Sequence, residues 1–168
     1  IFAIVHAETS TGVCQPMDGI GDLCRKFDCL LLVDTVTSLG GVPLFIDKWK
    51  IDLAYSCSQK GLSCPPGLGP FTMGPRAEEK LALRKGQVPN WYLDVSLLNK
   101  YWGSDRVYHH TAPVNMNFGI REALRLLANE GLEQAWTRHK INAQRLWNGL
   151  ESLGLELHVS EDLRLPTL

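Results

Sequence analysis

Leu30-Leu31-Leu32-Val33-Asp34 is the stretch that decides the fold. An apolar run that ends in a carboxylate is typical of a strand covered on both faces, as in a parallel sheet between helices. Further strands are predicted at Ile1–Val5, at Ile51–Ser56 and at Phe71–Met73. Met17–Phe27 has apolar residues at helical spacing and lies between the first two of these strands. The alternation predicts an α/β protein with a mostly parallel sheet flanked by helices.

The second part of the chain is predicted to be mainly helical. After a helix and an irregular, aromatic-rich stretch over about residues 77–103, one helix should end near Gly131 and a long amphipathic helix should stop at Gly154. The alternating residues Leu155, Leu157 and Val159 predict a strand. We therefore expect two parts. Residues 1–130 are the later part of a large domain, and residues 131–168 are a bridging helix and the first strand of a truncated small domain.

Composition excludes several classes of protein. The 168 residues are 45% hydrophobic with a formal net charge of -1, which fits a globular protein and gives no basic excess for nucleic acid. The longest apolar run is too short to span a membrane. Five cysteines without a C-x-x-C pair favour reduced thiols in an intracellular protein. Both ends read as strand-like, which favours an internal fragment of a longer chain.

Two charged residues follow predicted strand ends. Asp34 lies at the carboxyl end of its strand, where parallel sheets bind ligands and where a carboxylate can pair with a protonated ring nitrogen. Taken alone, it is more often a residue that caps a turn. Lys60, beside Gly61, follows the strand Ile51–Ser56 and can supply a nucleophilic amine. Its alternative interpretation is an ordinary solvated lysine.

Three other motifs are weaker. The loop after the first strand offers the hydroxyls of Thr9, Ser10 and Thr11, which suit a phosphate or phenolic oxygen but also an ordinary turn. Tyr108-His109-His110-Thr111 lacks the ligand spacing of a metal site, so no metal is expected. Gly19-Ile20-Gly21 resembles the start of a dinucleotide loop, but Cys24 occupies the third glycine position, which disfavours a nicotinamide dehydrogenase.

Together these segments resemble the class V, fold-type I pyridoxal-phosphate enzymes, and among them the alanine–glyoxylate (serine–pyruvate) aminotransferase branch. The resemblance extends over essentially the whole chain. The matching motifs are His6-Ala7-Glu8-Thr9-Ser10-Thr11-Gly12-Val13, Leu30-Leu31-Leu32-Val33-Asp34-Thr35-Val36, Ser58-Gln59-Lys60-Gly61, Pro65-Pro66-Gly67 and Tyr108-His109-His110-Thr111.

The resemblance implies a role for each matching residue. Lys60 would hold pyridoxal 5'-phosphate as a Schiff base and then act as general base and acid. Asp34 would pair with the pyridine nitrogen, and Thr9 would replace the serine that the family has beside the ring hydroxyl. The remaining implied contacts are Val36 against one ring face, Gln59 beside the phosphate, and Tyr108 with Thr111 at the phosphate of a neighbouring subunit's cofactor.

The resemblance also implies an activity. It is ping-pong transfer of an amino group from L-alanine or L-serine to glyoxylate or pyruvate, in a homodimer whose active sites are shared across subunits. The expected compartment is the peroxisome, with the mitochondrial matrix as the alternative. The family's substrate-carboxylate arginine and ring-stacking aromatic have no counterpart here, so the chain alone is expected to be inactive.

Two other interpretations stay open. Another class V enzyme, such as a cysteine desulfurase or a kynureninase-type lyase, would share the lysine and the aspartate. A desulfurase would need a cysteine at a mobile loop tip, and Cys57 and Cys64 beside Lys60 do not look like one. A truncated, non-catalytic product that packs without turning over is the second alternative.

Overall fold

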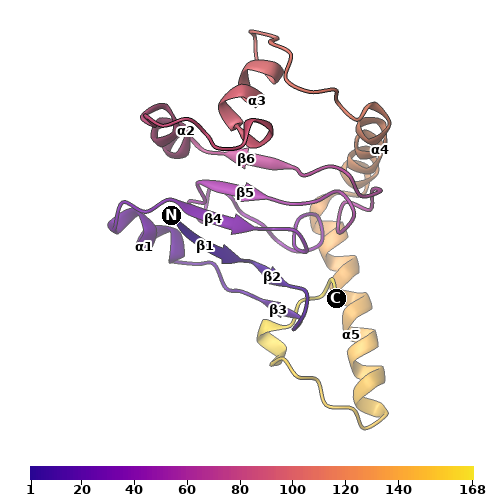
Figure 1. Ribbon diagram of the computed structural model, residues 1–168. Helices are drawn as coiled ribbons and strands as arrows, with labels where there is room; N and C mark the ends of the chain where they lie inside the picture. The colour runs from indigo at the N-terminus through magenta and orange to yellow at the C-terminus, as the bar shows by residue number, and fades with distance from the viewer.

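A four-stranded sheet organises the computed structural model, which describes residues 1–168 (Figure 1). Its strands are β1 (Phe2–Val5), β4 (Leu31–Asp34), β5 (Leu53–Tyr55) and β6 (Phe71–Met73), in that spatial order. The pairs β1–β4 and β4–β5 are parallel, whereas β6 runs antiparallel to β5. The predicted α/β architecture with a mostly parallel sheet is therefore confirmed.

A small hairpin follows β1 directly. It consists of β2 (Ala7–Glu8) and β3 (Val13–Cys14), which pair antiparallel. Its connecting turn contains the hydroxyl residues expected from the sequence, and Gly12 adopts φ +79° there, a conformation that favours glycine. The hairpin therefore holds Thr9 just beyond the carboxyl end of β1.

The helices lie largely where the periodicity predicted them. The helix between β3 and β4 begins at Ile20 rather than Met17, because Gly19 adopts the left-handed region, with φ +84°, immediately before it. The aromatic-rich stretch is more ordered than predicted, because Asn90 and Asp94 side chains cap two short helices. The helices are α1 (Ile20–Lys26), α2 (Pro75–Ala82), η1 (Trp91–Leu93), α3 (Val95–Trp102), α4 (Val114–Glu130), α5 (Leu132–Ser152) and η2 (Glu161–Leu163).

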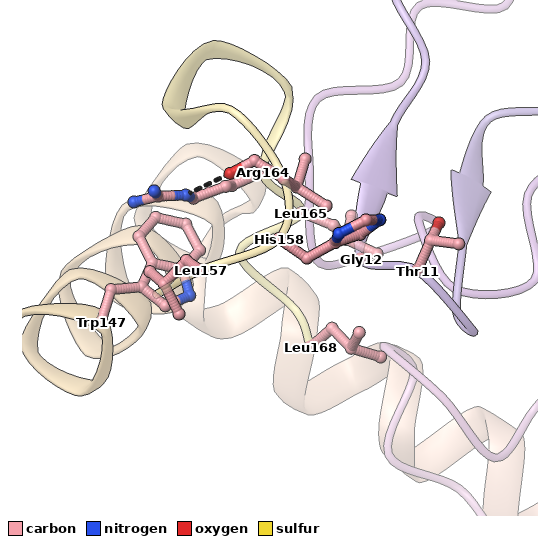
Figure 2. A pocket seen from close by; sticks show the side chains of 9 residues that line it. Thr11, Gly12, Trp147, Leu157, His158, Arg164, Leu165 and Leu168 are labelled. Carbon is pink, nitrogen blue, oxygen red and sulfur yellow. Dashed lines mark hydrogen bonds between the residues drawn. The ribbon is translucent and has the colours of Figure 1, made fainter. Parts of the chain in front are cut away.

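The prediction of a strand at Leu155–Val159 was wrong. Those residues form no strand, because the C-terminal segment instead turns back onto the β2–β3 hairpin, where Leu165 donates its N–H to the carbonyl of Gly12 at 2.8 Å. Figure 2 shows the cavity of about 170 Å³ behind this contact. Arg164 lines it, donating through Nε to the carbonyl of Val159 at 2.8 Å, with its guanidinium carbon 5.6 Å from the ring centre of Trp147. Leu157 and Val159 line this crevice rather than join a sheet, and Leu155 is exposed.

The main core lies between the parallel strands and α1. Met17, Leu31 and Val33 are almost fully buried, and residues of α1 and of the segment before β5 pack around them. The five cysteines form no disulfide in the structure, and Cys24 and Cys64 are buried. None of the helices combines the length and the apolar character that crossing a bilayer requires.

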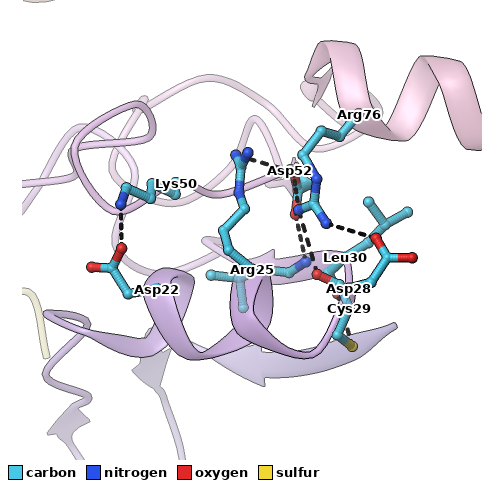
Figure 3. A network of polar contacts seen from close by, with 9 residues as sticks. Asp22, Arg25, Asp28, Cys29, Leu30, Lys50, Asp52 and Arg76 are labelled. Atoms are coloured by element: carbon cyan, nitrogen blue, oxygen red, sulfur yellow. Dashed lines mark hydrogen bonds and ion pairs between the residues drawn. The ribbon is translucent and has the colours of Figure 1, made fainter.

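A buried carboxylate connects the start of the sheet to two helices (Figure 3). Asp52 has a side chain that is 2% exposed; it accepts from the N–H of Leu31 at 2.9 Å and from Arg76 Nη1 at 3.0 Å. Arg25 of α1 approaches the same carboxylate at 3.5 Å. Arg76 of α2 also reaches the exposed Asp28 at 3.3 Å. The network fixes α1 and α2 against the amino ends of β4 and β5.

His6, which lies between β1 and β2, makes folding sensitive to acid. The side chain is 3% exposed, its Nδ1 atom has no hydrogen-bond partner, and burial lowers its pKa from the usual 6.5 to about 4. Between these pH values the unfolded chain binds a proton that the folded chain excludes. Above pH 6.5 His6 is neutral in both states, so acid does not destabilise the folded chain there. As the pH falls from 6.5 to 4, protonation of His6 in the unfolded chain lowers the free energy of unfolding by about 3 kcal/mol.

Urea unfolding at several pH values measures this loss. We expect His6→Gln to lose less unfolding free energy on acidification than the wild-type protein does. His158→Gln, at an exposed position, should retain the wild-type acid loss because its His6 is intact. Equal acid losses in wild type and His6→Gln would contradict the assignment.

Candidate active site

Three functional segments meet at the carboxyl edge of the sheet. The loop with Thr9 follows β1, Asp34 ends β4, and Lys60 follows β5. These strands are adjacent and parallel, with Val5 opposite Asp34 and Asp34 opposite Tyr55. The carboxyl ends of adjacent parallel strands lie at one edge of the sheet, where α/β proteins bind ligands. The arrangement brings together segments separated by about 25 residues each.

The Asp34 carboxylate is held from both sides. Its Oδ1 atom accepts from the backbone N–H of Val36 at 2.8 Å, and its Oδ2 atom accepts from the phenol of Tyr55 at 2.7 Å. The first bond makes the compact turn that an aspartate at a strand end favours. It also places the half-buried Val36 directly beside the carboxylate.

Thr9 is connected to the rest of the edge through a second threonine. Its hydroxyl lies 2.6 Å from the hydroxyl of Thr37, which is buried. The carbonyl of Thr37 accepts from the hydroxyl of Thr167 at 3.1 Å. The C-terminal segment and the β2–β3 hairpin therefore both hold Thr37, the residue directly after Val36.

The Lys60 loop is anchored by Ser58. Ser58 is fully buried, and its hydroxyl donates to the carbonyl of Pro65 at 2.7 Å and accepts from the N–H of Leu68 at 3.3 Å. Its backbone N–H also donates to the carbonyl of Leu68, at 3.0 Å. These hydrogen bonds of buried Ser58 fix the irregular loop between β5 and β6.

Gln59 and Lys60 belong to this anchored loop, and both residues are exposed. The Lys60 amine forms no ion pair or hydrogen bond with other side chains, so it is free to react with a ligand at the edge. The turn at Gly40 packs closely behind the loop. Gly40 has φ +85°, and a β-carbon there would lie 3.1 Å from the carbonyl oxygen of Gly61.

Tyr108 and Thr111 lie in the connection between α3 and α4, and both are exposed. Their hydroxyls are hydrogen-bonded to each other at 2.9 Å, rather than to residues at the sheet edge. Between them, His109 is buried, stacks on Trp91 with ring centres 4.0 Å apart, and donates through Nε2 to the carbonyl of that residue at 3.0 Å. The connection is therefore rigidly anchored while its two hydroxyls face outward.

Sequence reasoning missed three residues of this site. Tyr55, Thr37 and Ser58 hold Asp34, Thr9 and the Lys60 loop, respectively. A signal was present for Tyr55, because it ends the strand next to the one that Asp34 ends. Ser58 belongs to the motif around Lys60, but its anchoring role was not predicted, and no comparable signal marks Thr37; the partners of both are set by loop geometry.

Comparison with known proteins identifies the family. Residues 1–165 match the family described as aminotransferase class-V. The chain belongs to the class-V aminotransferases. The alanine–glyoxylate aminotransferase of Oryctolagus cuniculus is 48% identical over 172 residues, which cover 100% of this chain and 44% of the relative. That of Drosophila melanogaster is 43% identical, covering 100% of this chain and 44% of the relative.

Solved structures of class-V aminotransferases agree. The crystal structure of alanine–glyoxylate aminotransferase from Nostoc sp. matches with a TM-score of 0.96 and 65% identity, over 98% of this chain and 44% of that one. Ureidoglycine–glyoxylate aminotransferase from Bacillus subtilis matches with a TM-score of 0.94 and 39% identity, over 98% and 42%. The chain thus spans less than half the length of the relatives that it matches.

The competing cysteine desulfurase interpretation has a structural neighbour that shows likeness of fold alone. A cysteine desulfurase from Thermococcus onnurineus matches with a TM-score of 0.69 at 19% identity, over 92% of this chain and 39% of that one. The two cysteines nearest Lys60 are not exposed: Cys64 is buried, and the thiol of Cys57 lies 3.9 Å from the carbonyl of Val36. Neither lies at an exposed loop tip, where a desulfurase would need its nucleophile.

Proposed function

We propose that this chain supplies the cofactor-binding half of a pyridoxal 5'-phosphate-dependent aminotransferase. The observation that carries the proposal is the convergence of Thr9, Asp34 and Lys60 at the ends of three adjacent parallel strands. They supply a hydroxyl, a carboxylate and an amine, which suit the phenolic oxygen, the ring nitrogen and the aldehyde of pyridoxal phosphate, respectively. Membership in the class-V aminotransferases supports the same assignment.

The proposed division of labour follows from the chemistry of each group. Pyridoxal phosphate supplies an electron-withdrawing ring that stabilises negative charge at the amino-acid α-carbon. Asp34 holds a proton on the ring nitrogen by presenting a negative charge to it. Lys60 would hold the cofactor through its amine, and the same amine would move a proton at the α-carbon of the substrate. Val36 would pack against one ring face, and Gln59 would lie beside the phosphate.

We propose L-alanine or L-serine as amino donor and glyoxylate or pyruvate as acceptor. Two alanine–glyoxylate aminotransferases at 48% and 43% identity, and a third in the solved structure at 65%, support glyoxylate as the acceptor. Pyruvate appears in the name of a further structural relative, a pyridoxamine–pyruvate aminotransferase at 29% identity, whereas L-serine as donor stays a prediction. The peroxisomal location, with the mitochondrial matrix as alternative, and the division at residue 130 stay predictions.

We also propose a homodimer with shared active sites. Tyr108 and Thr111 project exposed hydroxyls from an anchored connection and bond only to each other in a single chain. Two such hydroxyls suit the phosphate of a cofactor bound to a second subunit. The expected mass in solution is twice that of one chain.

The half-reactions test the proposed activity. Full-length protein mixed with pyridoxal phosphate should turn yellow, L-alanine or L-serine should bleach the colour, and glyoxylate should restore it. Glycine should appear together with pyruvate when L-alanine is the donor. Release of sulfide from L-cysteine under reducing conditions, without exchange between L-alanine and glyoxylate, would instead support a desulfurase.

A further inference from the structure

Tyr55 and Asp34 form a matched pair across two strands. They end β5 and β4, respectively, and lie opposite each other in the parallel register. The Tyr55 phenol donates to Asp34 Oδ2 at 2.7 Å, while the N–H of Val36 donates to Oδ1 at 2.8 Å. Each carboxylate oxygen therefore has one fixed donor and keeps a further lone pair for another donor.

The electrostatics of the pair favour a donor phenol and an acceptor carboxylate. No lysine or arginine side chain forms an ion pair with Asp34, so both of its fixed donors are neutral. The hydrogen bond to Asp34 raises the pKa of Tyr55, which keeps the phenol protonated at neutral pH. Tyr55 is 40% exposed and lies at the edge of the sheet rather than in the core. The role of its hydroxyl is therefore the hydrogen bond to Asp34 rather than packing in the core.

We propose that Tyr55 is a positioning residue that fixes the rotation of the Asp34 carboxylate toward a protonated ring nitrogen of the cofactor. The inference rests on the proposed function and extends it to a residue outside the recognised motifs. Without the phenol, Asp34 is held through Oδ1 alone and can rotate about its terminal bond. The ring nitrogen then meets a carboxylate that is less often aimed at it.

A cofactor analogue isolates this role. Tyr55→Phe keeps the ring and removes the hydroxyl; Tyr92→Phe, at another exposed tyrosine whose hydroxyl makes no hydrogen bond, is the matched control. Affinity is measured by spectroscopic titration of the full-length apoprotein with pyridoxal phosphate and with 1-deazapyridoxal phosphate, which has carbon in place of the ring nitrogen. Thermal unfolding of the apoproteins reports structural damage separately.

We expect Tyr55→Phe to weaken pyridoxal phosphate binding roughly tenfold, since a hydrogen bond to a charged group is lost. Binding of the deaza analogue should be unchanged, because no ring nitrogen remains for Asp34 to face. In an Asp34→Ala background, Tyr55→Phe should have no further effect on either cofactor, as expected for a residue that acts through another. Tyr92→Phe should bind both cofactors as the wild type does.

Other results would overturn the inference in distinguishable ways. Equal weakening of both cofactors by Tyr55→Phe would show a structural role. Tighter binding of pyridoxal phosphate would show that the phenol covers the carboxylate and competes with the ring. Unchanged binding would overturn the role of Tyr55 while leaving the proposed function intact. A wild-type protein that binds neither cofactor would overturn both.

Discussion

Replacing Lys60 by alanine is expected to lower the kcat for amino transfer by roughly 10²–10⁴-fold, the usual cost of removing a general acid–base group. The variant loses the amine that moves the proton at the substrate α-carbon and also the covalent attachment of the cofactor. The fold should be unaffected, because Lys60 is exposed and its loop is anchored by Ser58. Steady-state assays with L-alanine and glyoxylate, together with thermal unfolding, measure the two properties separately.

Lys85→Ala is the matched control for this prediction. Lys85 is also exposed, lies in a loop after a helix, and forms no hydrogen bond or ion pair with other side chains. It should retain wild-type activity. A Lys60→Ala protein that keeps more than about a tenth of the wild-type kcat would contradict the proposed role, since general acid–base catalysis is worth at least about 10².

Replacing Asp52 by alanine is expected to lower the free energy of unfolding by about 3–5 kcal/mol, the cost of breaking a buried ion pair by removing one partner. The change removes the buried acceptor of Arg76, whose contact with Asp52 is drawn in Figure 3, and leaves the N–H of Leu31 without an acceptor. Urea unfolding with a fixed m-value measures the loss.

Asp28→Ala tests whether burial is the cause. Asp28 pairs with Arg76 and with Lys80 in the same network, but its side chain is 74% exposed. Exposed pairs contribute little, so the loss of stability should be far smaller than for Asp52→Ala. Similar losses for the two variants would show that the network does not depend on the buried position of Asp52.

The sheet edge was predictable because strand ends are visible in a sequence. The apolar run of one strand ends at Asp34, and Lys60 follows the end of the next strand by five residues; parallel strands bring such ends to one edge of the sheet. The resemblance to class V enzymes then assigned roles that neither residue has alone. The family is confirmed, whereas the individual roles stay predictions.

The supporting contacts were not predictable to the same degree. Asp52 and Arg76 are 24 residues apart, and neither lies at a spacing that marks a pair. Ser58 is satisfied by backbone groups of Pro65 and Leu68, whose positions depend on the path of an irregular loop. Such contacts depend on tertiary packing, and local periodicity does not contain that information.

The error at residues 155–159 has a related cause. Alternation of Leu155, Leu157 and Val159 satisfies the pattern of a strand, but a strand also needs a neighbour with free backbone groups. In the structure, Leu157 and Val159 line the crevice beside Trp147. The alternation matches the partial burial of Leu157 and Val159 but not of Leu155, which is exposed, and it does not identify what covers the two partly buried side chains.

Attachment of the cofactor to Lys60 is the central claim, and borohydride reduction tests it most directly. Full-length protein is incubated with pyridoxal phosphate, reduced, digested and mapped by mass spectrometry. The pyridoxyl group should lie on the peptide that contains Ser58-Gln59-Lys60-Gly61, at Lys60. A pyridoxyl group on another lysine, or no stable adduct, would contradict the claim.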